Sequence, residues 1–192
     1  MTFARSSQID ISISPYYHCM TRCVRRSYLC GQDDETGRDY SHRKPWIVSR
    51  IKHLTSVFAI HVCAYAIMSN HYHLVLFVDD EKARTWHSED IIARWGQLFP
   101  KDAKTIKYLS KKEAEHKVSL WQLRLTDISW FMRCLNESIA RYSNKEEDKK
   151  GRFWEGRFKS QALLDEGALL SAMVYVDLNP IRAKIAETPE GS

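Results

Sequence analysis

Two runs of β-forming residues lie three residues apart near the middle of the chain. They span residues 59–67 and 71–78, and both are rich in the β-branched and aromatic residues that favour strands. The turn-prone triplet Met68-Ser69-Asn70 stands between them. Two such runs joined by so short a connection predict an antiparallel hairpin. Any fold of this chain therefore has to contain an antiparallel sheet.

The rest of the chain alternates strand and helix signals. Strands are predicted at residues 16–24 and 161–164, and apolar residues at helical spacing predict helices at 42–58, from 128 to about 142, and from 165 onward. The order is strand, helix, strand, strand, helices, strand, helix. This order predicts an α+β fold, a ferredoxin-like antiparallel sheet with helices packed on one face.

A charged stretch separates the hairpin from the later elements. Residues 82–120 interleave lysines with single aromatic residues, a pattern that indicates helices and connecting loops. A chain of 192 residues with 44% hydrophobic residues can fold as one domain around a real core. We therefore predict a single domain over residues 1–192 with an insertion at about 82–120.

The cysteines and the chain ends bear on the cellular setting. Five cysteines, an odd number, suit reduced thiols better than a disulfide framework. Cys19, Cys23 and Cys30, even with the adjacent His18, fit no zinc-site spacing, so we expect core thiols. The N-terminus lacks the apolar block of a signal peptide, and no apolar run approaches the roughly 18 residues that a membrane span needs. These features predict a cytoplasmic protein with no membrane partner.

His71 and His73 flank Tyr72 in the second run of the hairpin. Side chains two positions apart in a strand point to the same face, so both imidazoles are expected to project together. Two neutral imidazoles side by side can hold a metal ion. The alternative is that two of eight histidines simply fall two positions apart on a half-exposed strand.

Tyr175 and Asn179 stand four residues apart in the final helical segment. They share one helix face if the helix persists through Asn179, although Pro180 is expected to interrupt or restart it because proline lacks an amide donor. A phenol can act as a covalent nucleophile, and an amide oxygen suits Mg²⁺ or Mn²⁺. Each residue alone also fits a structural role, as a core tyrosine or as a turn before proline.

The segment Gly151–Ser160 concentrates cations, aromatic rings and glycines. This is the composition of a surface on which bases stack on rings while phosphates meet cations. The alternative is a basic loop whose aromatic residues fill the core. Composition leaves both open.

Taken together, four segments in this order resemble the single-tyrosine HUH transposases, and most closely the REP-associated tyrosine transposases of bacteria. They are Pro15-Tyr16-Tyr17-His18, Met68-Ser69-Asn70-His71-Tyr72-His73-Leu74, Gly151 to Ser160, and Tyr175-Val176-Asp177-Leu178-Asn179-Pro180-Ile181-Arg182-Ala183. The resemblance covers about residues 15–186. Residues 82–120 are longer than the matching stretch of the most compact relatives.

The resemblance implies roles for these residues. His71, His73 and Asn179 match the metal ligands of the family, for Mg²⁺ or Mn²⁺, and Tyr175 matches the nucleophile. The implied activity is nicking and rejoining of single-stranded, hairpin-forming DNA through a 5′-phosphotyrosine intermediate. The implied DNA contacts are bases on Trp154 and Phe158 and phosphates on Arg152, Arg157, Lys159 and Arg182. Because relatives include both monomers and homodimers, the oligomeric state stays open.

The formal charge of +5 is compatible with nucleic acid but does not demand it. Its acidic residues gather at 33–39, 79–81 and 146–148, away from the basic segment Gly151–Ser160, so a weak net charge can hide a basic face. A catalytically silent nucleic-acid-binding module on the same fold is the alternative function. A structural metal-binding protein is a third reading, but it leaves the basic aromatic segment unexplained.

Overall fold

The computed structural model describes residues 9–24, 28–33 and 35–182, with side chains through Pro180. Its centre is a four-stranded antiparallel sheet in the order β2-β3-β1-β4. The strands are β1 (Tyr16–Arg22), β2 (Ile60–Ile67), β3 (His71–Val78) and β4 (Lys159–Ala162). The strand that carries His71 and His73, β3, is therefore an inner strand.

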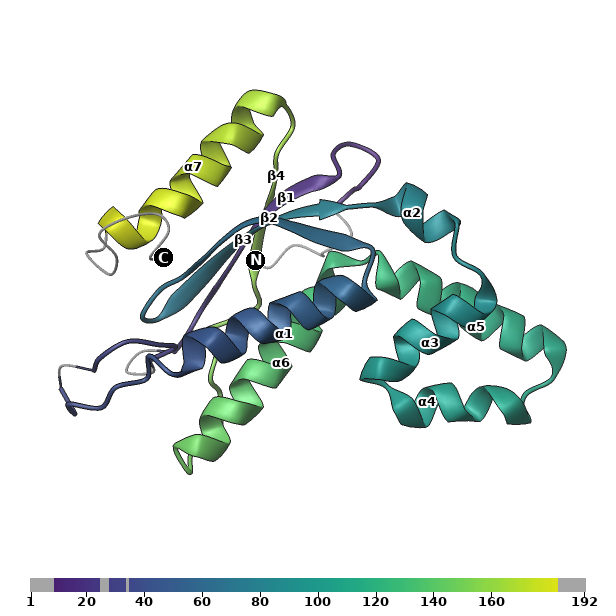
Figure 1. The fold of residues 1–192 in the computed structure, drawn as a ribbon, viewed down its shortest axis with the longest axis horizontal. Coiled ribbons are helices and arrows are strands. Elements are labelled where there is room, and N and C mark those ends of the chain that lie inside the picture. The colour runs from purple at the N-terminus through teal and green to yellow at the C-terminus, as the bar shows by residue number, and fades with distance from the viewer. Residues whose placement is uncertain (1–8, 25–27, 34, 183–192) are drawn as a thin grey trace.

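Helices cover both faces of this sheet (Figure 1). One face packs against α1 (Arg43–Val57) and α6 (Ile128–Glu146), and the opposite face packs against α7 (Glu166–Arg182). The strand order and the succession β1-α1-β2-β3-α6-β4 are ferredoxin-like, so the predicted fold class is confirmed. The sequence predicts helices on one face only, and α1 and α6 do share a face, but α7 differs from this prediction because it packs on the opposite face as a second layer. The inner strand requires this layer, because Leu74 and Val75 point to opposite faces and both are fully buried.

A helical segment separates β3 from α6 and lies to one end of the sheet (Figure 1). It consists of α2 (Asp80–Arg84), α3 (Ser88–Leu98), α4 (Pro100–Thr105), a 3₁₀ turn (Ile106–Tyr108) and α5 (Lys111–Leu125). At the start of α5 the Ser110 and Glu113 side chains each bind the other residue's backbone N–H, which satisfies amides that an uncapped helix leaves unpaired. Residues 82–120, the predicted insertion, lie within this segment.

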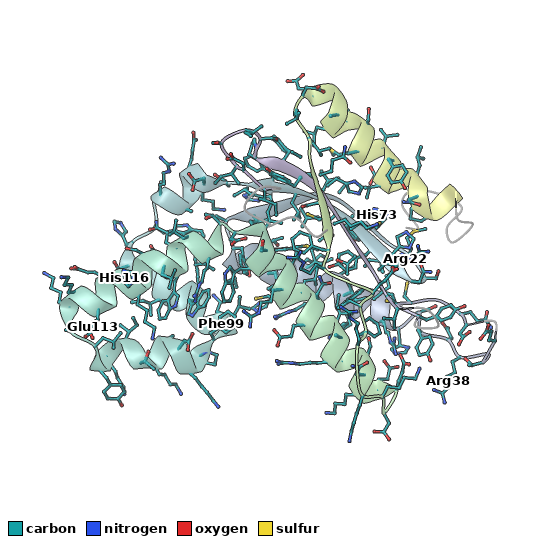
Figure 2. The ribbon with its side chains drawn as sticks, turned by 180° about the vertical axis from the view of Figure 1, so that it is seen from behind. Arg22, Arg38, His73, Phe99, Glu113 and His116 are labelled. Atoms are coloured by element: carbon teal, nitrogen blue, oxygen red, sulfur yellow. The ribbon has the colours of Figure 1, made fainter. Side chains whose placement is uncertain are left out.

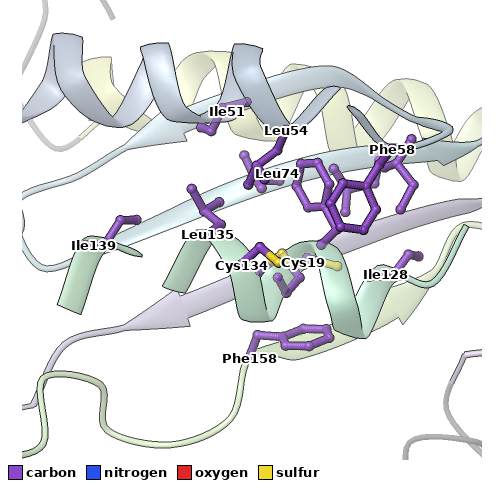
Figure 3. Packing of buried hydrophobic residues seen from close by; sticks show 14 of the residues in the cluster. Cys19, Ile51, Leu54, Phe58, Leu74, Ile128, Cys134, Leu135, Ile139 and Phe158 are labelled. Atoms are coloured by element: carbon purple, nitrogen blue, oxygen red, sulfur yellow. The ribbon is translucent and has the colours of Figure 1, made fainter. Parts of the chain in front are cut away.

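The larger core lies between the sheet and the α1–α6 layer. Leu54 of α1, Leu74 of β3 and Leu135 of α6 are all fully buried there (Figure 3). Phe58 and Phe131 meet edge to face with ring centroids 5.4 Å apart. The cysteines are free thiols, and four of them are buried: Cys19, Cys23, Cys30 and Cys134. The expectation of core thiols is thus confirmed for Cys19, Cys23 and Cys30, the cysteines weighed as zinc ligands in the sequence.

Several boundaries differ from the sequence prediction: β1 ends at Arg22, and α6 extends to Glu146. Helix α7 continues across Pro180 to Arg182, so the expected interruption is absent from its backbone. Strand β4 begins two residues earlier than predicted, because its pairing with β1 runs from Lys159 opposite Met20 to Ala162 opposite Tyr17. No helix within the described ranges is long and apolar enough to cross a membrane.

Candidate functional site

Three histidines gather on the sheet face that α7 covers. His71 and His73 lie on this face of β3, and their ring centroids are 5.0 Å apart. His18 of β1 lies opposite Val75, which makes it the diagonal neighbour of His73 across the strand pair. Nε2 of His18 is 2.9 Å from Nδ1 of His73, and the two rings stack with centroids 5.1 Å apart. The histidine spacing seen in the sequence thus becomes a three-ring cluster.

Helix α7 brings Tyr175 to this cluster. The Tyr175 ring meets His73 edge to face at 5.7 Å and His18 at 6.2 Å between centroids. Tyr175 is 43% exposed, so it is partly open to solvent beside the buried His73. The helix is anchored by Val176, which is fully buried in a cluster with Ala64, Ala66, Met68, Val75 and Leu163. The cluster and the candidate nucleophile therefore lie side by side.

Burial keeps the imidazoles neutral. His73 is only 3% exposed, and burial, followed by the neighbouring His18 and His71, lowers its pKa to about 3. Burial also lowers the pKa of His18, and burial together with Arg22 lowers that of His71. At neutral pH all three rings carry a free lone pair, which is the form in which histidine binds a metal.

Two of the side chains expected to bind a metal each have a buried polar atom that pairs with no described residue. Nε2 of His73 and Nδ2 of Asn179 are buried and have no hydrogen-bond partner in the structure. The oxygen and nitrogen of an asparagine amide can exchange places by rotation, so the buried position of Asn179 can present an oxygen. Among the described residues no group of three or more His, Cys, Asp or Glu is arranged to hold a metal.

The basic segment before β4 divides into buried rings and exposed cations. Trp154 and Phe158 are 9% and 8% exposed and belong to the large core, and Trp154 donates a 2.8 Å hydrogen bond to the carbonyl of Asn136. Their burial leaves little ring surface for the base stacking that the sequence suggests. Arg152 and Arg157 are exposed. The Arg182 side chain lies outside the described residues.

Lys159 is one of the cations predicted to contact DNA phosphates. The pairing of β4 with β1 defines the sheet face on which it lies. It lies opposite Met20, which itself lies opposite His73, so the three residues form one row across β4, β1 and β3. Residues directly opposite in antiparallel strands share a face. Lys159 therefore lies on the same face of the sheet as His73. Its side chain is exposed there.

Sequence reasoning missed three residues at this site. The family resemblance includes His18 and Asn70 in its segments but gives neither a role, and the sequence singles out Arg22 nowhere. Arg22 lies opposite His71, and His73 and Arg22 both lie on the sheet near α7 (Figure 2). Oδ1 of Asn70 is 2.7 Å from Nδ1 of His71. The register between β1 and β3 was the missing information, because it alone brings His18 and Arg22 beside the histidine pair.

Fold and site define an α+β protein with a ferredoxin-like sheet, paired histidines on an inner strand and a tyrosine on a helix across that face. The sequence matches no protein-family model and no curated protein. Among solved structures, the chain is similar to a REP-associated tyrosine transposase bound to a REP hairpin, with a TM-score of 0.55 and 10% identity. The similarity covers 98% of this chain and 78% of the other, and it shows a common fold. This shared fold supports the resemblance found in the sequence motifs.

Proposed function

We propose that this chain is a strand transferase that nicks and rejoins single-stranded DNA through a covalent bond to Tyr175. The observation that carries the proposal is the position of Tyr175, whose partly exposed ring lies 5.7 Å from that of His73 between centroids. A partly exposed tyrosine beside a cluster of uncharged histidines, of which His73 is buried, suits attack on a phosphodiester. A core tyrosine would have its ring enclosed instead.

In the proposed reaction the Tyr175 hydroxyl oxygen attacks the scissile phosphorus. The bond from phosphorus to the 3′-oxygen breaks, the phenol proton is lost, and the 3′-oxygen leaves as a hydroxyl. The new phosphotyrosine ester keeps the energy of the broken bond, so rejoining needs no nucleotide cofactor. The phenol of Tyr175 is a weak nucleophile and needs assistance. His71, His73 and Asn179 would hold a divalent ion for this purpose. When bound, such an ion neutralises charge that develops on the phosphate oxygens.

The proposed partner is hairpin-forming single-stranded DNA. Lys159 and Arg22 are exposed, and their strand positions place them in the rows of His73 and His71. Arg152 and Arg157 add exposed cations on the segment that leads into β4. Phosphate contacts of this kind position a strand without reading its sequence. The similar solved structure is bound to a REP hairpin, which makes a hairpin the first substrate to test.

The test is incubation of the protein with end-labelled hairpin DNA and Mn²⁺ or Mg²⁺, followed by a denaturing gel. The wild-type protein should form an adduct that survives denaturation, and Tyr175→Phe should abolish it. Tyr142→Phe is the matched control, because Tyr142 is similarly exposed, at 46% against 43%, but lies on α6 across the sheet. An adduct that persists in Tyr175→Phe would exclude this nucleophile.

Binding measured on the same hairpin separates the two candidate functions. A wild-type protein that binds the hairpin but forms no adduct with either metal would overturn the transferase and favour a silent binding module. His71→Ala and His73→Ala should abolish the adduct while leaving hairpin binding within a few-fold of the wild type. Undiminished adduct formation in both variants would remove the histidines from the mechanism.

A further inference from the structure

Both histidines of β3 use the same ring atom to contact a neighbour outside the pair. Nδ1 of His71 lies 2.7 Å from Oδ1 of Asn70, and Nδ1 of His73 lies 2.9 Å from Nε2 of His18. The neighbours come from different elements, since Asn70 belongs to the turn between β2 and β3 and His18 belongs to β1. In each ring the other nitrogen, Nε2, has no part in these contacts.

The contact with Asn70 bears on which nitrogen of His71 carries the proton. In this structure the Asn70 oxygen faces Nδ1 of His71, and a carboxamide oxygen can only accept a hydrogen bond, so Nδ1 donates in this arrangement. A neutral imidazole carries a single N–H. With the proton on Nδ1, Nε2 of His71 keeps its lone pair.

For His73 the contact with His18 allows two arrangements. If His18 donated, the proton of His73 would lie on Nε2, an atom that is buried and has no partner in the described structure. A buried N–H without an acceptor costs about 1–3 kcal/mol. If His73 donates from Nδ1, its Nε2 keeps a lone pair instead. A lone pair in that position can bind a metal ion, whereas an N–H cannot.

We propose that His18 and Asn70 are positioning residues that hold His73 and His71 as Nδ1–H tautomers, so that both Nε2 lone pairs remain available to a divalent ion. The proposal rests on the proposed function, which supplies the ion. Hydrogen bonds to the distal nitrogen of a metal-binding histidine fix its orientation and raise its basicity. Neither His18 nor Asn70 needs to touch the DNA or the reacting atoms in this role.

The tautomers can be measured without any metal. In metal-free protein labelled with ¹⁵N histidine, the ring nitrogen shifts of wild-type His71 and His73 should show protonated Nδ1 and unprotonated Nε2. His18→Leu should lose this preference at His73, and His18→Gln should retain it because the glutamine oxygen accepts the same hydrogen bond. A wild-type His73 protonated on Nε2 would overturn the role of His18 without the use of any variant. A wild-type His71 protonated on Nε2 would do the same for Asn70.

Calorimetric titration with Mn²⁺ then tests the consequence. His18→Leu and Asn70→Ala should each weaken binding by about 10- to 100-fold, the usual effect of losing such a partner. His18→Gln and Asn70→Asp, which keep an acceptor, should stay within a few-fold of the wild type. His61→Leu is the control, since His61 lies on β2 and contacts Asp79 instead, at 3.3 Å.

The two measurements separate this proposal from the proposed function. If the wild-type protein binds Mn²⁺ and His18→Leu and Asn70→Ala bind it equally well, the positioning role is wrong and the metal site stands. If the wild-type protein shows the Nδ1–H tautomers but binds no Mn²⁺, the metal site of the proposed function is wrong while the tautomer assignment stands.

Discussion

Tyr72 lies between two site residues in the sequence, but its side chain belongs to the core. It stands between His71 and His73, but strand alternation turns its ring to the opposite face, where it is fully buried. Its hydroxyl donates a 2.7 Å hydrogen bond to Oδ1 of Asn136 on α6, and burial raises the pKa of the phenol. The neighbour of both histidines is therefore a structural residue.

Tyr72→Phe tests this structural role. The change removes a buried hydrogen bond and leaves the Asn136 oxygen without its donor, so the free energy of unfolding should fall by about 1–2 kcal/mol. Adduct formation with hairpin DNA should stay unchanged, because the hydroxyl faces away from Tyr175. Urea unfolding and the adduct gel on the same preparation measure both effects. A large loss of adduct at unchanged stability would place Tyr72 in the site.

The site residues divide by the kind of information that predicts them. The expected placement of His71 beside His73 follows from the period of two in a strand. The expected placement of Tyr175 beside Asn179 follows from the helical period. The sequence alone is sufficient to predict both pairs. His18 reaches His73 through the pairing of β1 with β3, which joins residues 55 positions apart. Local periodicity contains no such long-range register.

At the scale of elements, Arg43 ties the start of α1 to the end of α6. Its guanidinium is fully buried and forms 2.8 Å ion pairs with Glu146 and Glu147 and a 2.8 Å hydrogen bond to the carbonyl of Tyr28. A buried charge is tolerated only when it is paired and hydrogen-bonded in this way. The cation is thus a structural connection on the face opposite the histidines.

Arg43→Met should lower the free energy of unfolding by about 3 kcal/mol, the low end for a broken buried pair, because the buried Glu147 carboxylate loses Arg43 and keeps only Lys149. Arg84→Met is the control, since its pair with Asp80 is largely exposed and should contribute less than about 1 kcal/mol. Chemical denaturation of both variants measures the difference. Equal effects of the two changes would contradict the structural role of Arg43.

The same ion pair predicts how stability responds to acid. Burial alone would raise the pKa of Glu147, but hydrogen bonds from Lys149 and Arg43 outweigh it and hold the pKa below its usual value of 4.5. A carboxyl with a lowered pKa in the folded state contributes stability above pH 4.5 that is lost as the pH falls below it. Melting temperatures measured from pH 6 to pH 3 should decline below 4.5, and less steeply in Arg43→Met. Parallel curves would exclude the pair as a source of this dependence.

Element boundaries show where sequence prediction reaches its limit. The hairpin strands and α1 match their predicted ranges within one residue, because apolar periodicity and turn chemistry define them locally. Strand β4 begins two residues early, since pairing with β1 sets its position. The burial of Trp154 and Phe158 could not be predicted from the sequence either. Composition shows that a ring is apolar, but it does not show which part of the protein covers the ring.

At the scale of the whole molecule, the helical segment shares its core with the sheet. Trp95 of α3 is 1% exposed and stacks on Trp121 of α5 at 5.5 Å, and it also meets Trp130 of α6 at 5.5 Å. These rings join the cluster that contains Phe131 and the strands. The segment between β3 and α6 is therefore continuous with the main core.

Continuity of the core predicts a single unfolding transition. Trp95→Ala should lower the free energy of unfolding by about 3–5 kcal/mol and shift the whole transition, because the cavity lies in a core common to both parts. Circular dichroism and tryptophan fluorescence should give the same midpoint in the wild type and in the variant. Two separate transitions, with only one of them shifted, would show that the helical segment folds on its own.

The two faces of the sheet should differ in their resistance to opening. The α1–α6 face is covered by a large cluster rich in aromatic and aliphatic side chains. Helix α7 is held by a smaller cluster with six buried members in the described part of the chain: Ala64, Ala66, Met68, Val75, Leu163 and Val176. The outer side of α7 remains apolar and exposed, with Leu170 at 62%. Local opening needs less free energy where less apolar surface is buried. The helix that carries Tyr175 is therefore the element most easily released from this sheet.

Hydrogen exchange measured by mass spectrometry tests this difference. Amides of α7 should exchange faster than those of α6, and Val176→Ala should accelerate exchange in α7 further while leaving α6 unchanged, because it removes buried methyl groups from the smaller cluster alone. Leu135→Ala is the matched change on the other face and should accelerate exchange across the main core. If α7 and α6 exchanged at the same rate in the wild type and both variants, the faces would open as one unit. The tyrosine would then stay fixed over the histidines for as long as the protein is folded.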